Sequence, residues 1–208
     1  MPIGLKGNSD GSGAIQIGGS DAISISTGLN TTFAGTITAT GTVAGTTGTL
    51  YPIVAATAVS ATGTAIDFTG IPSWVKRITV MFDAISTNGT SNYLVQLGDS
   101  GGIETTGYAS YGAFVGAATG TTTSTSGILL QSGAASYVHY GQIIISNING
   151  NSWVASHNIS IFQTSTSNYF AGVGGTSKTL SATLDRVRIT TVNGTDTFDA
   201  GTINLLWE

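Results

Sequence analysis

Cysteine is absent from the 208 residues, which excludes disulfide scaffolds, thiolate metal sites and thiol nucleophiles. Charge is also scarce, because Asp, Glu, Lys and Arg make up 8% of the chain, compared with about 25% in an ordinary globular domain. Only six residues are Lys or Arg, too few for the basic patch that phosphate binding needs, so we expect no nucleic-acid partner. With 40% hydrophobic residues and a net charge of -4, charge-driven disorder is excluded as well.

Long apolar runs are missing too. The isoleucine run at residues 143–145 has the length of a strand, whereas a bilayer-spanning helix needs roughly 20 apolar residues. We therefore expect no membrane insertion. The chain opens on Met1 and Pro2 and continues into polar Gly- and Ser-rich sequence, where a secretory signal would carry an apolar segment. We expect a protein that is made and kept in a cytoplasm.

What the sequence has instead is glycine and short alternating segments, above all in its first fifty residues. Residues 14–17, 22–25, 36–40 and 42–44 alternate with the period of a β-strand, and glycines separate them. Residues 35–49 contain no aromatic side chain, so alone they bury too little surface to offset about 1 to 2 kcal/mol of backbone entropy per residue. Copies wound together would cover one another. We predict that residues 1–50 form an extended β-rich shaft or anchor.

From residue 51 the sequence gains the larger side chains that a core requires. Ile78, Val80 and Phe82 alternate cleanly to one side, and Asn-Gly pairs beginning at residues 88, 149 and 193 favour tight turns. No segment has capped helical periodicity. Residues 51–208 are therefore predicted to form an all-β, jelly-roll-like β-sandwich. We expect its strands at residues 53–60, 65–68, 75–82, 93–97, 107–115, 128–131, 137–146, 153–162, 169–173, 184–192 and 203–207.

Long charge-free stretches bear on the oligomeric state. Residues 22–66 and 105–177 contain no Asp, Glu, Lys or Arg. Soluble β-proteins usually protect exposed sheet edges with charged side chains, above all lysine, and these stretches offer none. We infer that sister subunits cover the edges. We predict an intertwined homotrimer, because three strands close around an axis that small residues can line.

Four segments of the chain carry a resemblance to known proteins. Residues 13–25 (GAIQIGGSDAISI) and 33–43 (FAGTITATGTV) resemble the repetitive shafts of tailed-bacteriophage fibre proteins. Residues 66–78 (IDFTGIPSWVKRI) and 93–108 (YLVQLGDSGGIETTGY) are similar to segments of phage virion proteins. The resemblance covers most of the chain as scattered segments. It implies a structural role in a virion and trimeric assembly, either on the tail as a receptor-binding fibre or on the head as a decoration protein or head fibre.

One segment matches a catalytic motif. Residues 98–102 (GDSGG) match the nucleophile segment of chymotrypsin-like serine proteases. Those enzymes need a His and an Asp earlier in the chain, whereas His139 and His157 both follow Ser100. We interpret the segment as a glycine-rich turn. We expect the histidines to be strand residues hydrogen-bonded to their neighbours, because no acidic residue lies between them to complete a metal site; a histidine on a threefold axis could instead bind an ion with its two copies.

Carboxylates offer no obvious catalytic pair. Glycoside hydrolysis needs two carboxyl groups about 5 to 9.5 Å apart, and nothing in the spacing of Asp67, Asp83, Asp99 and Glu104 selects two of them. We interpret these acids as solvated turn residues. We expect no enzymatic activity, no cofactor and no metal.

Aromatic side chains give the candidate binding residues, because sugar rings stack on exposed Tyr and Trp faces. Most of the aromatic residues are expected in the core. Tyr108 and Tyr111 lie in a Gly-, Ser- and Ala-rich segment that is typical of a loop, so they are the candidate ligand-binding residues for a glycan.

The sequence thus predicts a non-enzymatic virion protein, made in the bacterial host cytoplasm. Residues 1–50 are expected to attach it to other virion proteins, and residues 51–208 to form the head domain of a short trimeric tail fibre or spike that binds host-surface glycans. The alternative is a capsid decoration or head-fibre protein, whose head domain clamps neighbouring capsid subunits and binds no receptor.

Overall fold

The computed structural model describes residues 4–7, 13–16, 43–45, 48–116 and 119–208, and its contacts divide the chain into two units, residues 1–50 and 51–208. In the first unit, strand β1 (Gly4–Gly7) pairs antiparallel with β2 (Gly13–Gln16). Likewise, β3 (Val43–Gly45) pairs antiparallel with β4 (Gly48–Leu50). The strands predicted at residues 22–25 and 36–40 lie outside the described residues.

The second unit confirms the predicted all-β class, since no helix occurs among its described residues. The strands of this unit are β5 (Val54–Ala55), β6 (Val59–Ser60), β7 (Ala65–Thr69), β8 (Arg77–Thr87), β9 (Tyr93–Asp99), β10 (Gly102–Ile103), β11 (Tyr108–Gly116), β12 (Thr119–Ser124), β13 (Ile128–Leu130), β14 (Tyr137–Asn149), β15 (Ser152–Gln163), β16 (Asn168–Thr179), β17 (Arg186–Thr191) and β18 (Phe198–Trp207).

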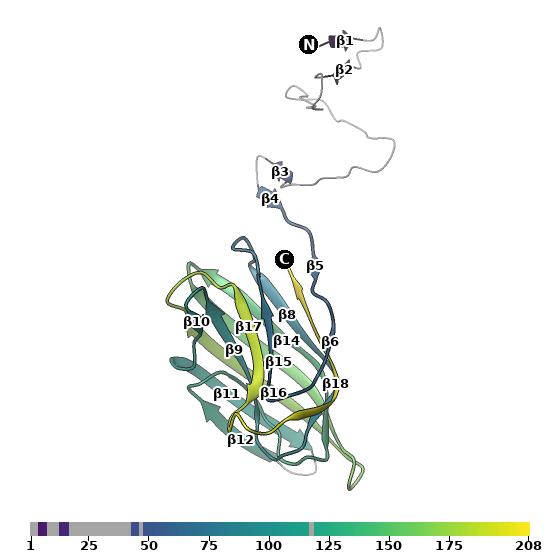
Figure 1. The fold of residues 1–208 in the computed structure, drawn as a ribbon, viewed down its shortest axis with the longest axis vertical. Coiled ribbons are helices and arrows are strands. Elements are labelled where there is room, and N and C mark those ends of the chain that lie inside the picture. Colours follow the sequence, from purple (N-terminus) through teal and green to yellow (C-terminus); the bar gives the residue numbers. More distant parts are fainter. Residues whose placement is uncertain (1–3, 8–12, 17–42, 46–47, 117–118) are drawn as a thin grey trace. The chain divides into compact units, whose positions relative to one another are not determined.

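These strands pair antiparallel in two sheets (Figure 1). The smaller sheet has the order β10-β9-β17-β7, with β13 also paired to β9. The larger sheet has the order β12-β11-β16-β15-β14-β8-β18-β5, with β6 also paired to β18. The chain alternates between the sheets from β7 to β9 and again from β16 to β18, whereas β14, β15 and β16 follow one another as a meander.

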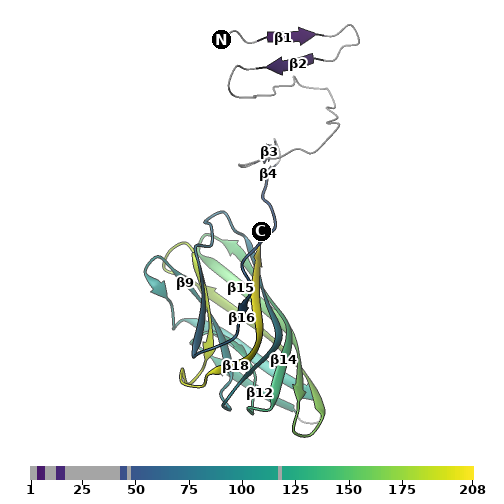
Figure 2. The same ribbon diagram turned by 45° about the vertical axis from the view of Figure 1, so that its right-hand side comes forward.

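One hydrophobic core lies between the two sheets, which face each other across it (Figure 2). Along β15, every second residue from Trp153 to Ile161 is buried, and Ile78, Val80 and Phe82 of β8 face the core as predicted. Burial of these side chains stabilises the sandwich by roughly 25 cal/mol for each Å² of apolar surface removed from water. The largest fully buried side chains are Tyr93, Ile78, Ile85, Leu97, Ile128, Leu129, Leu130, Ile143, Ile145, Ile159, Ile161 and Ile189.

Two of the predicted Asn-Gly turns contain a glycine in the left-handed region. Gly150, between β14 and β15, has a φ of 46°, and Gly194, after β17, has a φ of 66°. A Cβ placed on either glycine meets no atom within 4 Å, so it is the backbone conformation and not a lack of space that favours glycine here. The turn predictions at these two pairs are confirmed.

The strands differ from the prediction where the apolar pattern fades. Strand β12 is not predicted from the sequence, because its Thr, Gly and Ser residues show no apolar alternation, yet it pairs with β11 along six residues. Strand β16 continues past Val173 through two glycines to Thr179. Strand β8 continues past Phe82 through an irregularity at Ala84, whose φ is 56°. In each case the neighbouring strands impose an extended conformation that local sequence does not encode.

Candidate functional site

Strands β12, β11, β16, β15 and β14 lie side by side in the larger sheet. Among their described residues, none with an ionised side chain faces outward from the sandwich. Strand register places Tyr111 beside Gly175 and Ser156 in one row of this face. The next row contains Val173 and Asn158. Exposed apolar patches of this kind mark interaction sites more often than scattered surface residues do. The exposed large apolar side chains on these strands are Tyr111, Val115, Tyr140, Ile148, Val154, Tyr169 and Val173.

Four of the five Lys and Arg residues of the second unit form ion pairs away from this face. Arg188 of β17 donates two hydrogen bonds of 2.7 Å to Asp67 of β7. Each of these cations has a carboxylate partner, so the described ion pairs leave little positive charge for an anionic ligand. The other ion pairs are Arg77 with Glu208, Lys178 with Glu104, and Arg186 with Asp185.

Of the two tyrosines predicted to bind ligand, only Tyr111 lies at the surface. Both belong to strand β11, so the interpretation of this segment as a loop is wrong. Tyr108 is 3% exposed, and its hydroxyl accepts a 2.7 Å hydrogen bond from the Leu97 N–H and lies 3.1 Å from the Glu104 carbonyl oxygen, to which it donates. Burial raises the pKa of Tyr108. Tyr111 is 66% exposed.

Two shallow hollows lie on the outer face of the larger sheet. The first, of about 360 Å³, is bordered by Tyr111 together with β12 and β16. The second, of about 460 Å³, is lined by four aromatic residues, which no sequence pattern singles out as a group. In it, the rings of Phe162 and Tyr169 stack with centroids 4.9 Å apart and planes 28° apart. The side chains that line the second hollow are Tyr140, Ser160, Ile161, Phe162, Tyr169 and Phe170.

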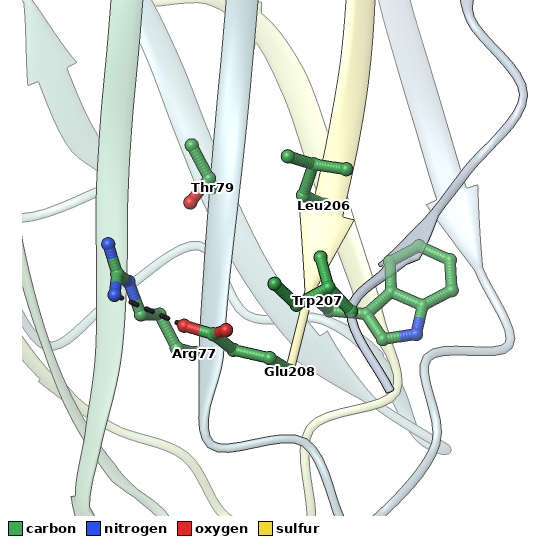
Figure 3. A pocket seen from close by; sticks show the side chains of 6 residues that line it. Arg77, Thr79, Leu206, Trp207 and Glu208 are labelled. Carbon is green, nitrogen blue, oxygen red and sulfur yellow. Dashed lines mark hydrogen bonds and ion pairs between the residues drawn. The ribbon is translucent and has the colours of Figure 1, made fainter. Parts of the chain in front are cut away.

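Two further hollows are less suited to a ligand. The one in Figure 3, at the ends of β8 and β18, measures about 230 Å³, below the roughly 300 Å³ at which small-molecule sites begin. Arg77 points toward Glu208 there, with 3.1 Å between Nη1 and Oε1. The other lies beside the smaller sheet and measures about 470 Å³. Its Gln96 amide already donates to the Ser126 carbonyl, and its Arg188 is paired with Asp67.

The protease-like segment forms the predicted turn, between β9 and β10. Ser100 is exposed at this turn, and no hydrogen bond in the described chain joins it to either histidine. The Asp99 carboxylate accepts a hydrogen bond of 2.8 Å from the Gly101 N–H, as in an Asx turn. The three parts of a serine-protease triad are therefore not brought together by these contacts.

Both histidines lie inside the sandwich. His139 on β14 is fully buried, with Nε2 3.3 Å from the Gln131 carbonyl oxygen, and its ring packs 4.6 Å from that of Tyr93. His157 on β15 is also buried, and its Nδ1 has no hydrogen-bond partner among the described residues, which corrects the expectation of a bonded imidazole. Burial lowers the pKa of each histidine to about 4. Because both rings are enclosed by their own subunit, neither reaches a copy on a threefold axis.

Two of the four acids named from the sequence converge on one serine. The Ser181 hydroxyl donates to Asp99 at 2.8 Å, and its N–H donates to Glu104 at 2.6 Å. Burial would raise the pKa of Glu104, but hydrogen bonds from Lys178 and Ser181 outweigh it and lower that pKa. Hydrogen bonds from Ser181 and Gly101 lower the pKa of Asp99. Such a pair lacks the carboxyl group of raised pKa that donates a proton in glycoside hydrolysis.

Among the residues that the structure describes, no group of three or more His, Asp or Glu side chains is placed to hold a metal ion. The described ranges also contain no helix with the length and apolar character needed to cross a membrane.

Comparison of the chain with protein-family models, with curated proteins and with solved structures finds no match.

Proposed function

We propose that this chain is a non-enzymatic subunit of a virion fibre or spike, a homotrimer that attaches through residues 1–50 and binds a host-surface glycan through its β-sandwich. The observation that carries the proposal is the outer face of β12, β11, β16, β15 and β14, which bears no ionised side chain among the described residues and exposes aromatic rings. The resemblance of residues 13–25 and 33–43 to phage fibre shafts supports the virion setting. The alternation of the chain between the two sheets supports a jelly-roll-like arrangement.

Strand β12 supports the association of identical copies. It is the outermost strand of the larger sheet in the described chain, and it consists of Thr, Gly and Ser, without the Lys or Pro that usually protects an edge. The opposite edge is formed by β5 and β6, which are two residues each. An uncharged edge of six regularly paired residues is a template for strand addition by another chain. Pairing between copies would cover it.

A lysine on this edge is expected to weaken the trimer. Thr121 is exposed on β12 and Thr69 is exposed on β7, next to Asp67. Thr121→Lys adds an edge charge that a neighbouring strand must desolvate, so we expect its trimer fraction at micromolar concentration to fall at least tenfold. Thr69→Lys, the matched control, is expected to leave the trimer intact. Sedimentation velocity of both variants measures this, and an unchanged Thr121→Lys trimer would show that β12 is not at the interface.

Binding tests separate the two virion roles. The full-length protein is incubated with whole host cells, with purified lipopolysaccharide and with capsids that lack it. Retention on cells or lipopolysaccharide is the expected result for a fibre or spike. Retention on capsids alone would instead support the decoration or head-fibre role.

A further inference from the structure

We infer that the glycan site lies at the aromatic cluster of Tyr140, Phe162 and Tyr169, and that its ligand is an uncharged pyranose oligosaccharide. The inference rests on the proposed function and deepens it. It places the sugar contact not at Tyr111 but at a hollow that three rings of the same sheet face line.

Strand register assembles the cluster from three neighbouring strands. Phe162 of β15 lies directly opposite Tyr169 of β16, and Tyr140 of β14 lies opposite Ser160 of β15. Each of these residues follows or precedes a buried residue of its strand, so its side chain projects from the outer face. The cluster therefore sits on paired strands, which hold it more rigidly than a loop would.

The shape of the cluster suits a sugar ring. Tyr169 is 72% exposed, and its ring stacks on the ring of Phe162. The Phe162 ring therefore supports the exposed Tyr169 ring. Ile161 and Phe170, which belong to the core, also line the hollow of about 460 Å³. Aromatic faces bind the C–H face of a pyranose, and the volume is within the range of small-ligand sites.

Polar groups surround the aromatic surface. The Ser160 hydroxyl lines the hollow itself. At the adjacent turn between β15 and β16, the Gln163 amide donates to the Ser165 hydroxyl at 3.2 Å, and this hydroxyl is 3.2 Å from that of Ser136. These linked groups are exposed, and they belong to the turn that joins Phe162 of β15 to Tyr169 of β16 along the chain. Sugar hydroxyls need partners of this kind.

The charge of the side chains in and around the hollow determines which sugars it favours. None of the side chains that line the hollow is ionised, so an acidic sugar would find no cation there. The strand next to Tyr140 is β8, where Asp83 and Ala84 occupy the irregularity opposite residues 139–141. A carboxylate on the neighbouring strand disfavours an anionic ligand through charge repulsion. An uncharged oligosaccharide is therefore the ligand that the site favours.

The position of the cluster suits recognition of a surface. The second unit begins near the end of the sandwich where β5 pairs with Leu206 and Trp207, and Trp207 in turn aligns with Ile78 and Ile145. Val138, which aligns with Phe162, is seven residues from Ile145 along β14, about 23 Å in an extended strand. By this register, the aromatic cluster lies toward the end of the sandwich opposite to the start of the unit.

Tyr111 lies outside this site, at the other hollow of the face. Its hollow is lined by threonines, glycines, Ala113 and Val173, with no second aromatic ring. It is otherwise a close match to Tyr169, because both are exposed tyrosines that project from the same sheet face. Tyr111→Ala is therefore the control for Tyr169→Ala.

The test measures binding of the full-length protein to immobilised neutral tetrasaccharides of glucose, galactose and mannose, with tetragalacturonate as the acidic counterpart. We expect binding to at least one neutral probe and none above background to tetragalacturonate. Tyr169→Ala should lower the affinity at least tenfold, Tyr169→Phe should keep it within about threefold because the ring remains, and Tyr111→Ala should keep it within about twofold.

Three results would overturn the inference. They are the absence of binding to every neutral probe, preferred binding of tetragalacturonate, and a loss of affinity in Tyr111→Ala with none in Tyr169→Ala. The oligomeric state of each preparation is measured alongside. A trimer without this binding contradicts the inference alone, whereas a monomeric wild type contradicts the proposed function. A trimer that Tyr169→Ala dissociates would show that a second copy, and not a sugar, covers the cluster.

Discussion

Glu104→Gln will lower the free energy of unfolding by about 3 kcal/mol, because it leaves the buried Lys178 ammonium without its counter-charge. The Lys178 side chain is 6% exposed and that of Glu104 is 21% exposed. The ammonium also lies 5.3 Å from the ring centre of Tyr108, so it has little room to reach water. The loss is large against the 5 to 15 kcal/mol that is typical for a whole domain. Urea denaturation at neutral pH measures it.

A matched pair of variants isolates the effect of burial. Asp67→Asn breaks the exposed ion pair between Asp67 and Arg188, in which the Arg188 side chain is 36% exposed and the Asp67 side chain 42% exposed. This variant should lower the free energy of unfolding by less than about 1 kcal/mol. Adding Lys178→Met to Glu104→Gln should restore more than half of the loss, because it removes the unpaired charge. Equal losses at both ion pairs, or no recovery in the double variant, would contradict this explanation.

Acidification from about pH 7 to pH 4 will destabilise the protein through its two buried histidines. Burial lowers the pKa of His139 and His157 from 6.5 to about 4, so between these values the unfolded chain binds protons that the folded chain does not. Their contribution to stability is complete above pH 6.5 and is lost as the pH falls toward 4. Each histidine adds a slope of up to about 1.4 kcal/mol per pH unit. Urea midpoints at several pH values measure the slope.

A histidine variant checks the assignment. His157→Met removes one titrating group while it keeps an apolar side chain of similar size, so the slope in this window should fall by about half. The lowered pKa values of Asp99, Glu104 and Asp196 act at lower pH, since their contribution is lost only below the ordinary values of 3.8 to 4.5. A slope that His157→Met leaves unchanged would assign the pH dependence to other groups.

Much of the fold could be predicted because the core strands carry their own signal. In β8 and β15 the alternation of large apolar and polar residues both marks the strand and selects its inner face. Strand β12 lacks this signal, since threonine suits a strand but does not reveal which face is buried. The pairing of β12 with β11 depends on register, which becomes visible only in three dimensions.

The candidate site likewise combines features that the sequence can predict with features that only the three-dimensional structure brings together. Tyr108 and Tyr111 are three residues apart in sequence, and so on opposite faces of one strand, which puts one in the core and the other on the surface. A loop interpretation treats them alike. Tyr140, Phe162 and Tyr169 are far apart in sequence and meet only through the register of three strands. A tyrosine that is an even number of residues away from the buried residues of its strand shares their inward face. Such a tyrosine is the first to set aside when exposed rings are sought.

Light scattering coupled to gel filtration of the full-length protein, at micromolar concentration and neutral pH, tests the central claim most directly. The claim is that an all-β chain with so few charges stays in solution by covering its uncharged edge with its own copies. The predicted result is a single species with three times the 21.0 kDa mass of one chain. A stable, monodisperse species with the mass of one chain would contradict it.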